Sequence, residues 1–193
     1  MRKRAFVAVF AILLSQIVLG AMLQDFAYLF LIEQKVPESH AKLLAQTLEE
    51  EAEHIPESVD PLLMLAFGLS ETNFMNVFGD SGKAVGYFQL HENAVFYVAN
   101  FYDDVKEFKK QNRNHVDLIK HPDWQLRIAY RYMYLTLKNV HNWDIIKAIS
   151  SYNGRSDKYN IYVVNFFRNY AMVVEKYLDF SNKNASNVSK STK

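Results

Sequence analysis

The chain of 193 residues contains no cysteine, six glycines and four prolines. The absence of cysteine excludes disulfides, cysteine-ligated zinc and thiol catalysis, but it leaves the cellular compartment open. An excess of one charge sign is also missing, because the formal net charge is +1 and both signs are mixed along the chain. A protein that binds nucleic acid through phosphate contacts needs a basic face, so we expect no nucleic-acid partner.

Several catalytic motifs are absent as well. Gly79, Gly82 and Gly86 do not join a strand to a basic helix, as a phosphate-binding loop requires. No serine stands in a G-x-S-x-G motif, and no H-E-x-x-H motif occurs. The six histidines lack the spacing of metal ligands on one helix; they are His40, His54, His91, His115, His121 and His141. We therefore expect no metal ion and no other cofactor.

The N-terminus combines a basic triplet with an apolar run. Residues 2–4 are Arg-Lys-Arg, and no further charge occurs before Asp25. The apolar stretch 5–23 is typical of an export signal or a membrane anchor, and its length leaves both open. Ala21 stands where a lipoprotein signal would need cysteine, so lipid attachment there is excluded. Because basic residues stay in the cytoplasm, the chain after residue 25 is predicted to lie in the cell envelope, periplasmic or otherwise extracytoplasmic.

The remaining sequence predicts one mainly helical domain with a small irregular or β-like segment near residues 77–90. Hydrophobic residues make up 50% of the chain, which is enough for a sizeable core. Asp60 and Pro61 are typical of a helix start, and Ser39 is predicted to cap an earlier helix. Helices are expected over 39–55, 60–71, 92–110, 121–140, 142–153 and 158–180. The predicted order is a signal or anchor (1–24), a helical extension (25–56), a main domain (57–180) and a disordered tail (181–193).

Glu71 is the most distinctive polar residue in this pattern. It ends an almost wholly apolar helix and lies close in sequence to Phe67, Phe74 and Phe78. Desolvation and the negative end of the helix dipole both raise the pKa of a carboxylate in such a position. A carboxylic acid that stays protonated near neutral pH is what cleavage of a glycosidic bond needs. The helix alone leaves a plain alternative open, in which Glu71 is only the polar end of a buried helix.

Two later segments favour the catalytic interpretation. "GYFQL" (86–90) places Gln89 beside two aromatic residues, and "SYNG" (151–154) places Tyr152 and Asn153 at a helix end. The order of the three segments resembles that of the soluble lytic transglycosylases, which have a lysozyme-like domain. That family shows E-S-x-F, then a Gly/Ala-rich stretch ending in G-L-M-Q, then A-Y-N-x-G. The resemblance covers about residues 57–180.

The resemblance implies a function. Members of the family cleave the β-1,4 bond between N-acetylmuramic acid and N-acetylglucosamine in peptidoglycan and leave a 1,6-anhydro product. Glu71 would be the single general acid and base. Thr72, Asp80, Gln89, Tyr152 and Asn153 would bind substrate or orient Glu71, and Tyr87 and Phe88 would offer a surface for sugar stacking or else pack in the core.

The chain departs from the family pattern at several positions. Thr72 replaces a serine but keeps a hydroxyl group, and Tyr87–Phe88 replaces Leu-Met. Asp80 falls where the family often has a serine that contacts substrate. A second carboxylate there leaves open a hydrolytic muramidase in which Asp80 activates water, and a non-catalytic peptidoglycan-binding envelope component is a third alternative.

The expected partners follow from the same resemblance. They are the glycan strands of peptidoglycan, a membrane contacted through residues 5–23, and secretion or conjugation machinery of the cell envelope. The last of these is an analogy with small enzymes of the family and does not come from particular residues.

Overall fold

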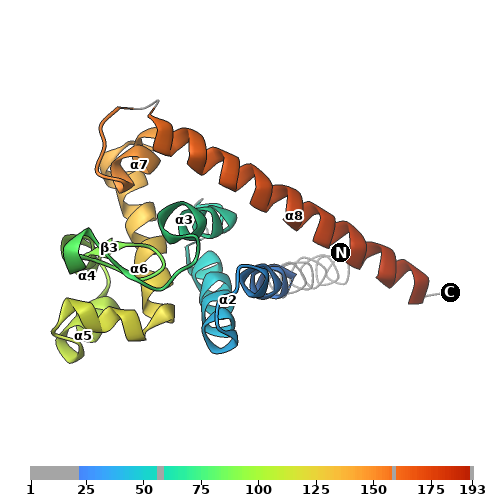
Figure 1. The fold of residues 1–193 in the computed structure, drawn as a ribbon, viewed down its shortest axis with the longest axis horizontal. Helices are drawn as coiled ribbons and strands as arrows, with labels where there is room; N and C mark the ends of the chain where they lie inside the picture. The colour runs from blue at the N-terminus through green and yellow to red at the C-terminus, as the bar shows by residue number, and fades with distance from the viewer. Residues whose placement is uncertain (1–21, 56–58, 158–159, 192–193) are drawn as a thin grey trace, which may run out of the picture.

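Helix α3 (Leu62–Thr72) is central to the fold, and its side chains from Leu62 to Gly68 are all buried. Asp60 lies just before the helix: its carboxylate accepts a hydrogen bond from the Leu62 backbone N–H at 2.9 Å, while Pro61 already has helical backbone angles. The long helix α8 (Ile161–Ser191) packs along α3, and Figure 1 shows that it runs along one edge of the molecule and ends beyond the other labelled helices. The predicted central apolar helix is therefore confirmed, although it begins at Leu62 and its N-cap position is Pro61 instead of Asp60.

The computed structural model describes residues 22–55, 59–157 and 160–191. In these ranges the chain forms one mainly helical domain with a small three-stranded antiparallel sheet, which confirms the predicted fold class. Its other helical elements are a helix over residues 22–33, α2 (Glu38–His54), α4 (Glu92–Ala99), α5 (Asp103–Gln111), α6 (Pro122–Leu135) and α7 (Ile145–Tyr152), with shorter turns at Asp80–Gly82, His115–Lys120 and Thr136–Val140.

The sheet occupies the segment predicted to be β-like. Strands β1 (Phe78–Gly79), β2 (Ala84–Val85) and β3 (Leu90–His91) follow one another in the order of the chain. Phe78 pairs with Val85, and Val85 pairs in turn with Leu90. Strand β3 lies beside α4, and residues of β2 and β3 line one wall of the candidate site described below (Figure 1).

The predicted N-terminal extension (25–56) packs into the same core as the rest of the chain. In the helix over residues 22–33, Phe26 contacts the Tyr177 ring of α8 edge-on with ring centroids 5.1 Å apart. Helix α2 packs against α6. One detail of the prediction is wrong: α2 begins at Glu38, directly after Pro37, and Ser39 lies inside the helix instead of capping it.

The predicted signal or anchor (1–24) lies almost wholly outside the described residues, which begin at residue 22. Among the helices that are described, none is both long and apolar enough to span a membrane.

Two predicted boundaries are corrected. The helix expected over 92–110 is interrupted, because α4 ends at Ala99 and Tyr102 adopts an extended backbone before α5. Asp103 and Asp104 then favour a new start, since acidic side chains stabilise a helix N-terminus. The tail expected to be disordered from residue 181 continues α8 as far as Ser191. It contains neither glycine nor proline, and extending an existing helix needs no new nucleation.

A buried ion cluster joins α2, α5 and α6. Glu51 is fully buried, and its carboxylate accepts hydrogen bonds from Arg131 Nε at 2.8 Å and from Arg127 Nη1 at 2.6 Å. Arg131 also donates to Asp104 Oδ1 at 2.7 Å. Every charge in the cluster therefore has an opposite partner, which is the condition under which buried charges are tolerated.

Breaking this cluster at Glu51 should destabilise the fold strongly. Glu51→Gln keeps the size of the side chain but removes the fully buried carboxylate that both guanidinium groups share, and leaves each with one partly exposed partner, Glu50 or Asp104. We therefore expect a loss of about 3–5 kcal/mol in the free energy of unfolding. Urea unfolding followed by circular dichroism measures it. The matched control is Glu50→Gln, which removes the more exposed partner of Arg127 and should cost less than about 1 kcal/mol. Equal losses in the two variants would contradict the assigned role of Glu51.

Candidate active site

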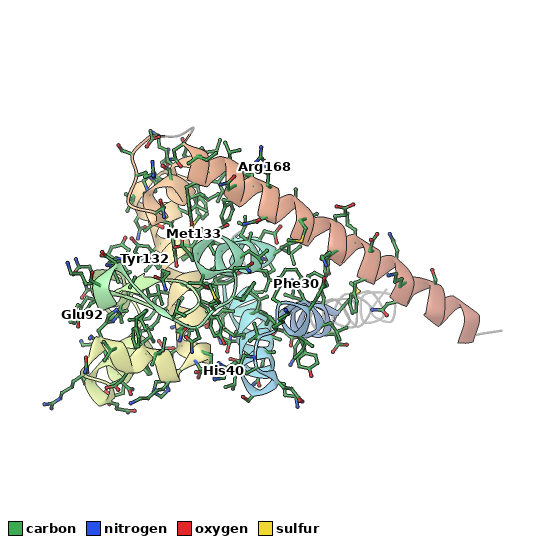
Figure 2. All side chains as sticks on the ribbon, viewed as in Figure 1. Phe30, His40, Glu92, Tyr132, Met133 and Arg168 are labelled. Atoms are coloured by element: carbon green, nitrogen blue, oxygen red, sulfur yellow. The ribbon has the colours of Figure 1, made fainter. Side chains whose placement is uncertain are left out.

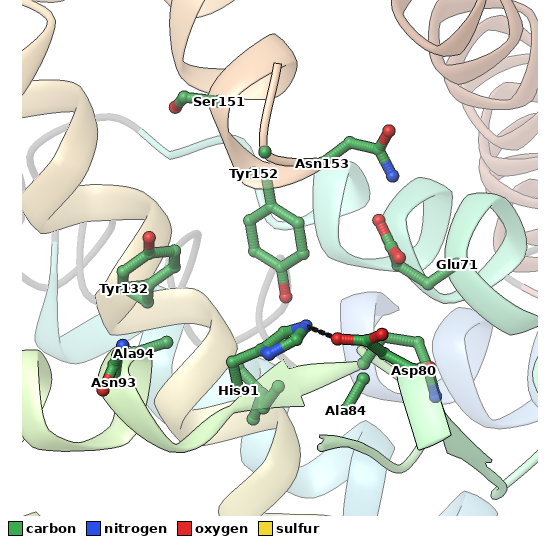
Figure 3. Close-up of a pocket in the computed structure, with 13 residues that line it drawn as sticks. Glu71, Asp80, Ala84, His91, Asn93, Ala94, Tyr132, Ser151, Tyr152 and Asn153 are labelled. Atoms are coloured by element: carbon green, nitrogen blue, oxygen red, sulfur yellow. Dashed lines mark ion pairs between the residues drawn. The ribbon is translucent and has the colours of Figure 1, made fainter. Parts of the chain in front are cut away.

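An open pocket of about 480 Å³ lies where α3, the sheet, α4, α6 and α7 meet. Figure 3 shows its side chains, with Glu71 and Asp80 on one side and Tyr132 on the other. The pocket brings together five of the residues predicted from sequence, and its lining consists of Glu71, Asp80, Ala84, Gln89, Leu90, His91, Asn93, Ala94, Tyr132, Ser151, Tyr152, Asn153 and Gly154.

Glu71 lies in the last turn of α3, just before the chain leaves the helix. Asn73 ends the helix in the left-handed conformation, with φ of 52°, and its N–H bonds back to the helix carbonyls. Removal of the carboxyl from water raises the pKa of Glu71 from 4.5 to about 7. A hydrogen bond from the Tyr162 hydroxyl to Glu71 Oε1 acts in the opposite direction, because it stabilises the charged form and lowers the pKa. Glu71 is thus able both to give and to accept a proton near neutral pH.

Tyr162 is a site residue that the sequence did not single out. It lies in the first turn of α8, and its position is fixed by Asn160, whose side chain accepts a hydrogen bond from the Val163 N–H at 3.1 Å. Burial raises the pKa of the Tyr162 hydroxyl far above its ordinary value, and the nearby Glu71 carboxylate raises it further. Tyr162 therefore stays a hydrogen-bond donor. Its only sequence signal is a tyrosine within an apolar helix start, which is too common to be specific.

The segment that carries Gln89 is held by a second buried glutamine. Gln125 of α6 accepts a hydrogen bond from the Tyr87 N–H at 2.8 Å and donates to the Leu118 carbonyl at 2.9 Å. Gly86 is required here, because it has φ of +80° and a Cβ atom would lie 2.0 Å from Gln125 Oε1. This contact explains the glycine of "GYFQL" in physical terms.

Gln89 itself points its amide into the turn. Its Nε2 donates to the Gly86 carbonyl at 2.9 Å and to the Val77 carbonyl at 3.2 Å. The side-chain oxygen lies over Gly79, where a Cβ atom would come within 1.8 Å of it. Gln89 lines the pocket, and backbone carbonyls accept the hydrogen bonds of its amide, so its predicted role in binding substrate stays a prediction.

Three predicted binding residues do not line the pocket. Tyr87 and Phe88 are each 1% exposed and belong to the core, so a sugar-stacking role for them is wrong and the alternative of core packing holds. The hydroxyl of Thr72 is also buried and donates to the Tyr87 carbonyl at 3.0 Å. Thr72 therefore ties α3 to the glutamine-bearing segment and does not reach a ligand. Residues 84–88 are all buried, a pattern that follows neither a helical nor a β period, so the sequence could not place these rings.

Tyr152 and Asn153 lie at the end of α7, opposite the sheet. The Tyr152 hydroxyl donates to the Phe88 carbonyl at 2.9 Å, and its ring packs against Phe67 of α3 with centroids 4.4 Å apart. Asn153 is exposed, and Figure 3 shows its amide on the same side of the pocket as Glu71. Tyr152 therefore holds α7 to the segment between β2 and β3, whereas Asn153 presents polar atoms to the open pocket.

Asp80 faces the pocket from the turn between β1 and β2. It has φ of +45°, and its carboxylate Oδ2 lies 3.9 Å from His91 Nε2 (Figure 3). Both side chains are more than half exposed. His91, like Tyr132, was not among the residues predicted from sequence. Among the described residues no group of histidine and carboxylate side chains is arranged to hold a metal ion.

Comparison with known proteins adds no assignment: no family model, curated protein or solved structure matches the chain.

The raised pKa of Glu71 predicts a pH dependence of stability. The folded protein keeps the proton on Glu71 up to about pH 7, whereas the unfolded chain loses it near 4.5, so the contribution of Glu71 to stability falls as pH rises between these values. Glu71→Gln removes this loss, so the free energy of unfolding of the variant should rise relative to that of the wild type by about 3 kcal/mol between pH 4 and pH 8. Urea unfolding of both proteins at several pH values measures the difference. A constant difference across that range would show that Glu71 has an ordinary pKa.

Proposed function

We propose that the protein is a peptidoglycan lytic transglycosylase and that Glu71 is its catalytic acid and base. The observation that carries the proposal is a partly buried carboxyl with a pKa of about 7, held by Tyr162 at the wall of an open pocket. The resemblance of the three motifs to the transglycosylase family supports it, because Glu71, Gln89 and the Tyr152–Asn153 pair meet in that pocket.

The reaction would need one group that reverses its role. Glu71 first gives its proton to the glycosidic oxygen as the bond to C1 of the muramic acid breaks. The 2-acetamido group of the same sugar stabilises the positive charge that develops at C1. The Glu71 carboxylate then takes the proton from the 6-hydroxyl, whose oxygen bonds to C1. The ring closes as a 1,6-anhydro sugar, and no water is consumed.

The neighbouring groups suit this cycle. The Tyr162 hydroxyl donates to the carboxylate after the first proton transfer and keeps it oriented for the second. Asn153 is exposed at the mouth of the pocket, where its amide can bind the polar groups of a sugar. The chain after residue 25 is predicted to lie outside the cytoplasm. This location agrees with the proposed substrate, since peptidoglycan is built outside the membrane.

A hydrolytic muramidase is the second candidate, and the position of Asp80 is the reason to keep it. Asp80 lines the same pocket as Glu71 and lies in a turn stabilised by the sheet. An exposed carboxylate there could accept a proton from an attacking water molecule. The products of the two reactions differ, so the two candidates are separable.

Product analysis tests the choice between them. Wild-type protein incubated with purified peptidoglycan should release 1,6-anhydromuropeptides, detected by mass spectrometry, and Glu71→Gln should lower the rate by about 100-fold or more. Asp80→Asn should leave the anhydro product in place. Reducing ends throughout, lost in Asp80→Asn, would favour the hydrolase. Glycan binding without any cleavage by the wild type would favour a non-catalytic binding protein.

The Tyr162 hydrogen bond predicts the pH dependence of the rate. Because Glu71 must start protonated, kcat/KM should fall above about pH 7. Tyr162→Phe removes a hydrogen bond that favours the charged carboxylate. The pH above which kcat/KM falls should therefore rise by about one pH unit.

The matched control for this variant is Tyr170→Phe. It makes the same change two turns further along α8, where the hydroxyl donates to Asp60 instead of Glu71. Its pH profile should equal that of the wild type. If Tyr162→Phe and Tyr170→Phe give the same profile, the hydrogen bond does not tune Glu71.

A further inference from the structure

A second groove lies between α4 and α5, apart from the pocket that holds Glu71. Its volume is about 450 Å³. Four of the eight residues that line it are cationic; the lining consists of Glu92, Phe96, Ala99, Asn100, Lys106, Lys109, Lys110 and Arg113. We call this surface the basic groove.

The charges of the basic groove are only partly neutralised. Lys109 pairs with Glu92 at 2.6 Å, and Lys110 pairs with Glu107 at 3.0 Å. Lys106 and Arg113 are exposed, and neither has a carboxylate partner among the described residues. These two cations leave the groove with a net positive charge in a protein whose overall net charge is only +1.

The floor of the basic groove is aromatic. Phe96 is 49% exposed, and the Lys109 ammonium lies 4.7 Å from the centre of its ring. Lys109 is itself only 11% exposed, so its position over the ring is fixed by its neighbours. An apolar floor with cations around it suits a ligand that carries both alkyl groups and carboxylates.

Helix α4 separates the basic groove from the active-site pocket. Its N-terminal residues Asn93 and Ala94 line the pocket, whereas Glu92 and Phe96 line the groove. Figure 2 shows Glu92 and the pocket residue Tyr132 in the same region of the molecule. A ligand that fills the pocket can therefore extend over α4 into the groove.

We propose that the basic groove binds the carboxylate-bearing peptide stem of the glycan strand while the pocket holds the sugars. The proposal rests on the proposed function, because only a peptidoglycan strand presents an acidic peptide beside the sugar chain. The stem leaves the glycan through the lactyl group of muramic acid and carries free carboxylates together with alkyl side chains. Lys106 and Arg113 would pair with those carboxylates, and Phe96 would contact the alkyl part.

The position of the basic groove disfavours an anionic membrane as its occupant. In Figure 1 the helix over residues 22–33, which directly follows the apolar N-terminal stretch, lies on the side of α2 away from α5. A membrane contacted through that stretch would thus face another part of the molecule. The acidic peptide therefore remains the ligand that the charge and the location favour together.

Kinetics on two substrates test this proposal. The substrates are glycan strands with their peptide stems and the same strands after an amidase has removed the stems. Lys106→Gln/Arg113→Gln should raise KM for the peptide-bearing strands by about threefold to tenfold with kcat unchanged, as expected for two exposed ion pairs. Its kinetics on bare strands should equal those of the wild type. Raising the salt concentration should reduce the wild-type preference for peptide-bearing strands.

A matched control and a direct binding measurement complete the test. Lys42→Gln/Arg168→Gln also removes one lysine and one arginine, both exposed and outside the groove, and should leave both KM values unchanged. Wild-type KM values in Lys106→Gln/Arg113→Gln on peptide-bearing strands would overturn the proposal. A rise in KM of the same size on bare strands would also overturn it.

The binding measurement separates this proposal from the proposed function. If the wild type cleaves neither strand, the catalytic assignment fails. NMR titration with a free acidic stem peptide then tests, independently of catalysis, whether the basic groove binds the peptide. Shifts of the α5 amides that disappear in Lys106→Gln/Arg113→Gln would support it, and unshifted amides would overturn it. Binding of the groove to phosphatidylglycerol vesicles but not to the peptide would also overturn it, in favour of a membrane contact.

Discussion

The contact between α3 and α8 is the constraint on which the site depends. It covers the apolar length of α3 and brings Tyr162 against the carboxyl at its end. Two opposing effects then meet on Glu71: desolvation disfavours its charge, and the tyrosine hydroxyl favours it. A carboxyl between these effects changes protonation near neutral pH, which is the property that a single acid and base requires. Helix α8 therefore serves the site through Tyr162 in its first turn, and the core through its packing along α3.

The rest of the architecture fixes what faces Glu71. Gln125 bonds the backbone of the turn that carries Gln89, and the Thr72 hydroxyl joins that turn to α3. Tyr152 closes the same arrangement from α7 through the Phe88 carbonyl. Because these bonds are made by buried groups, the wall of the pocket is rigid, and polar atoms such as the amide of Asn153 stand on a fixed frame.

The sequence predicted the parts of the fold that depend on local signals. An apolar run behind Asp60 and Pro61 indicates a buried helix, and three glycines between 77 and 90 indicate turns and short strands. What it could not predict depends on contacts between distant segments. Tyr162 is 91 residues from Glu71, and the buried state of Tyr87 and Phe88 follows from the way Gln125 holds their turn. The sequence carries one signal of the break between α4 and α5, because two aspartates at the start of α5 favour a new helix there. The predicted N-terminal signal or anchor lies almost wholly outside the described residues, so it stays a prediction.

The central claim is that Glu71 holds a proton near neutral pH inside this pocket. NMR titration of the protein with ¹³C-labelled glutamate, assigned by comparison with Glu71→Gln, measures it directly. The account predicts that the Glu71 carboxyl titrates near pH 7, well above the ordinary 4.5. A midpoint at or below 4.5 would contradict it, because Glu71 would then be an ionised helix end with no proton to give.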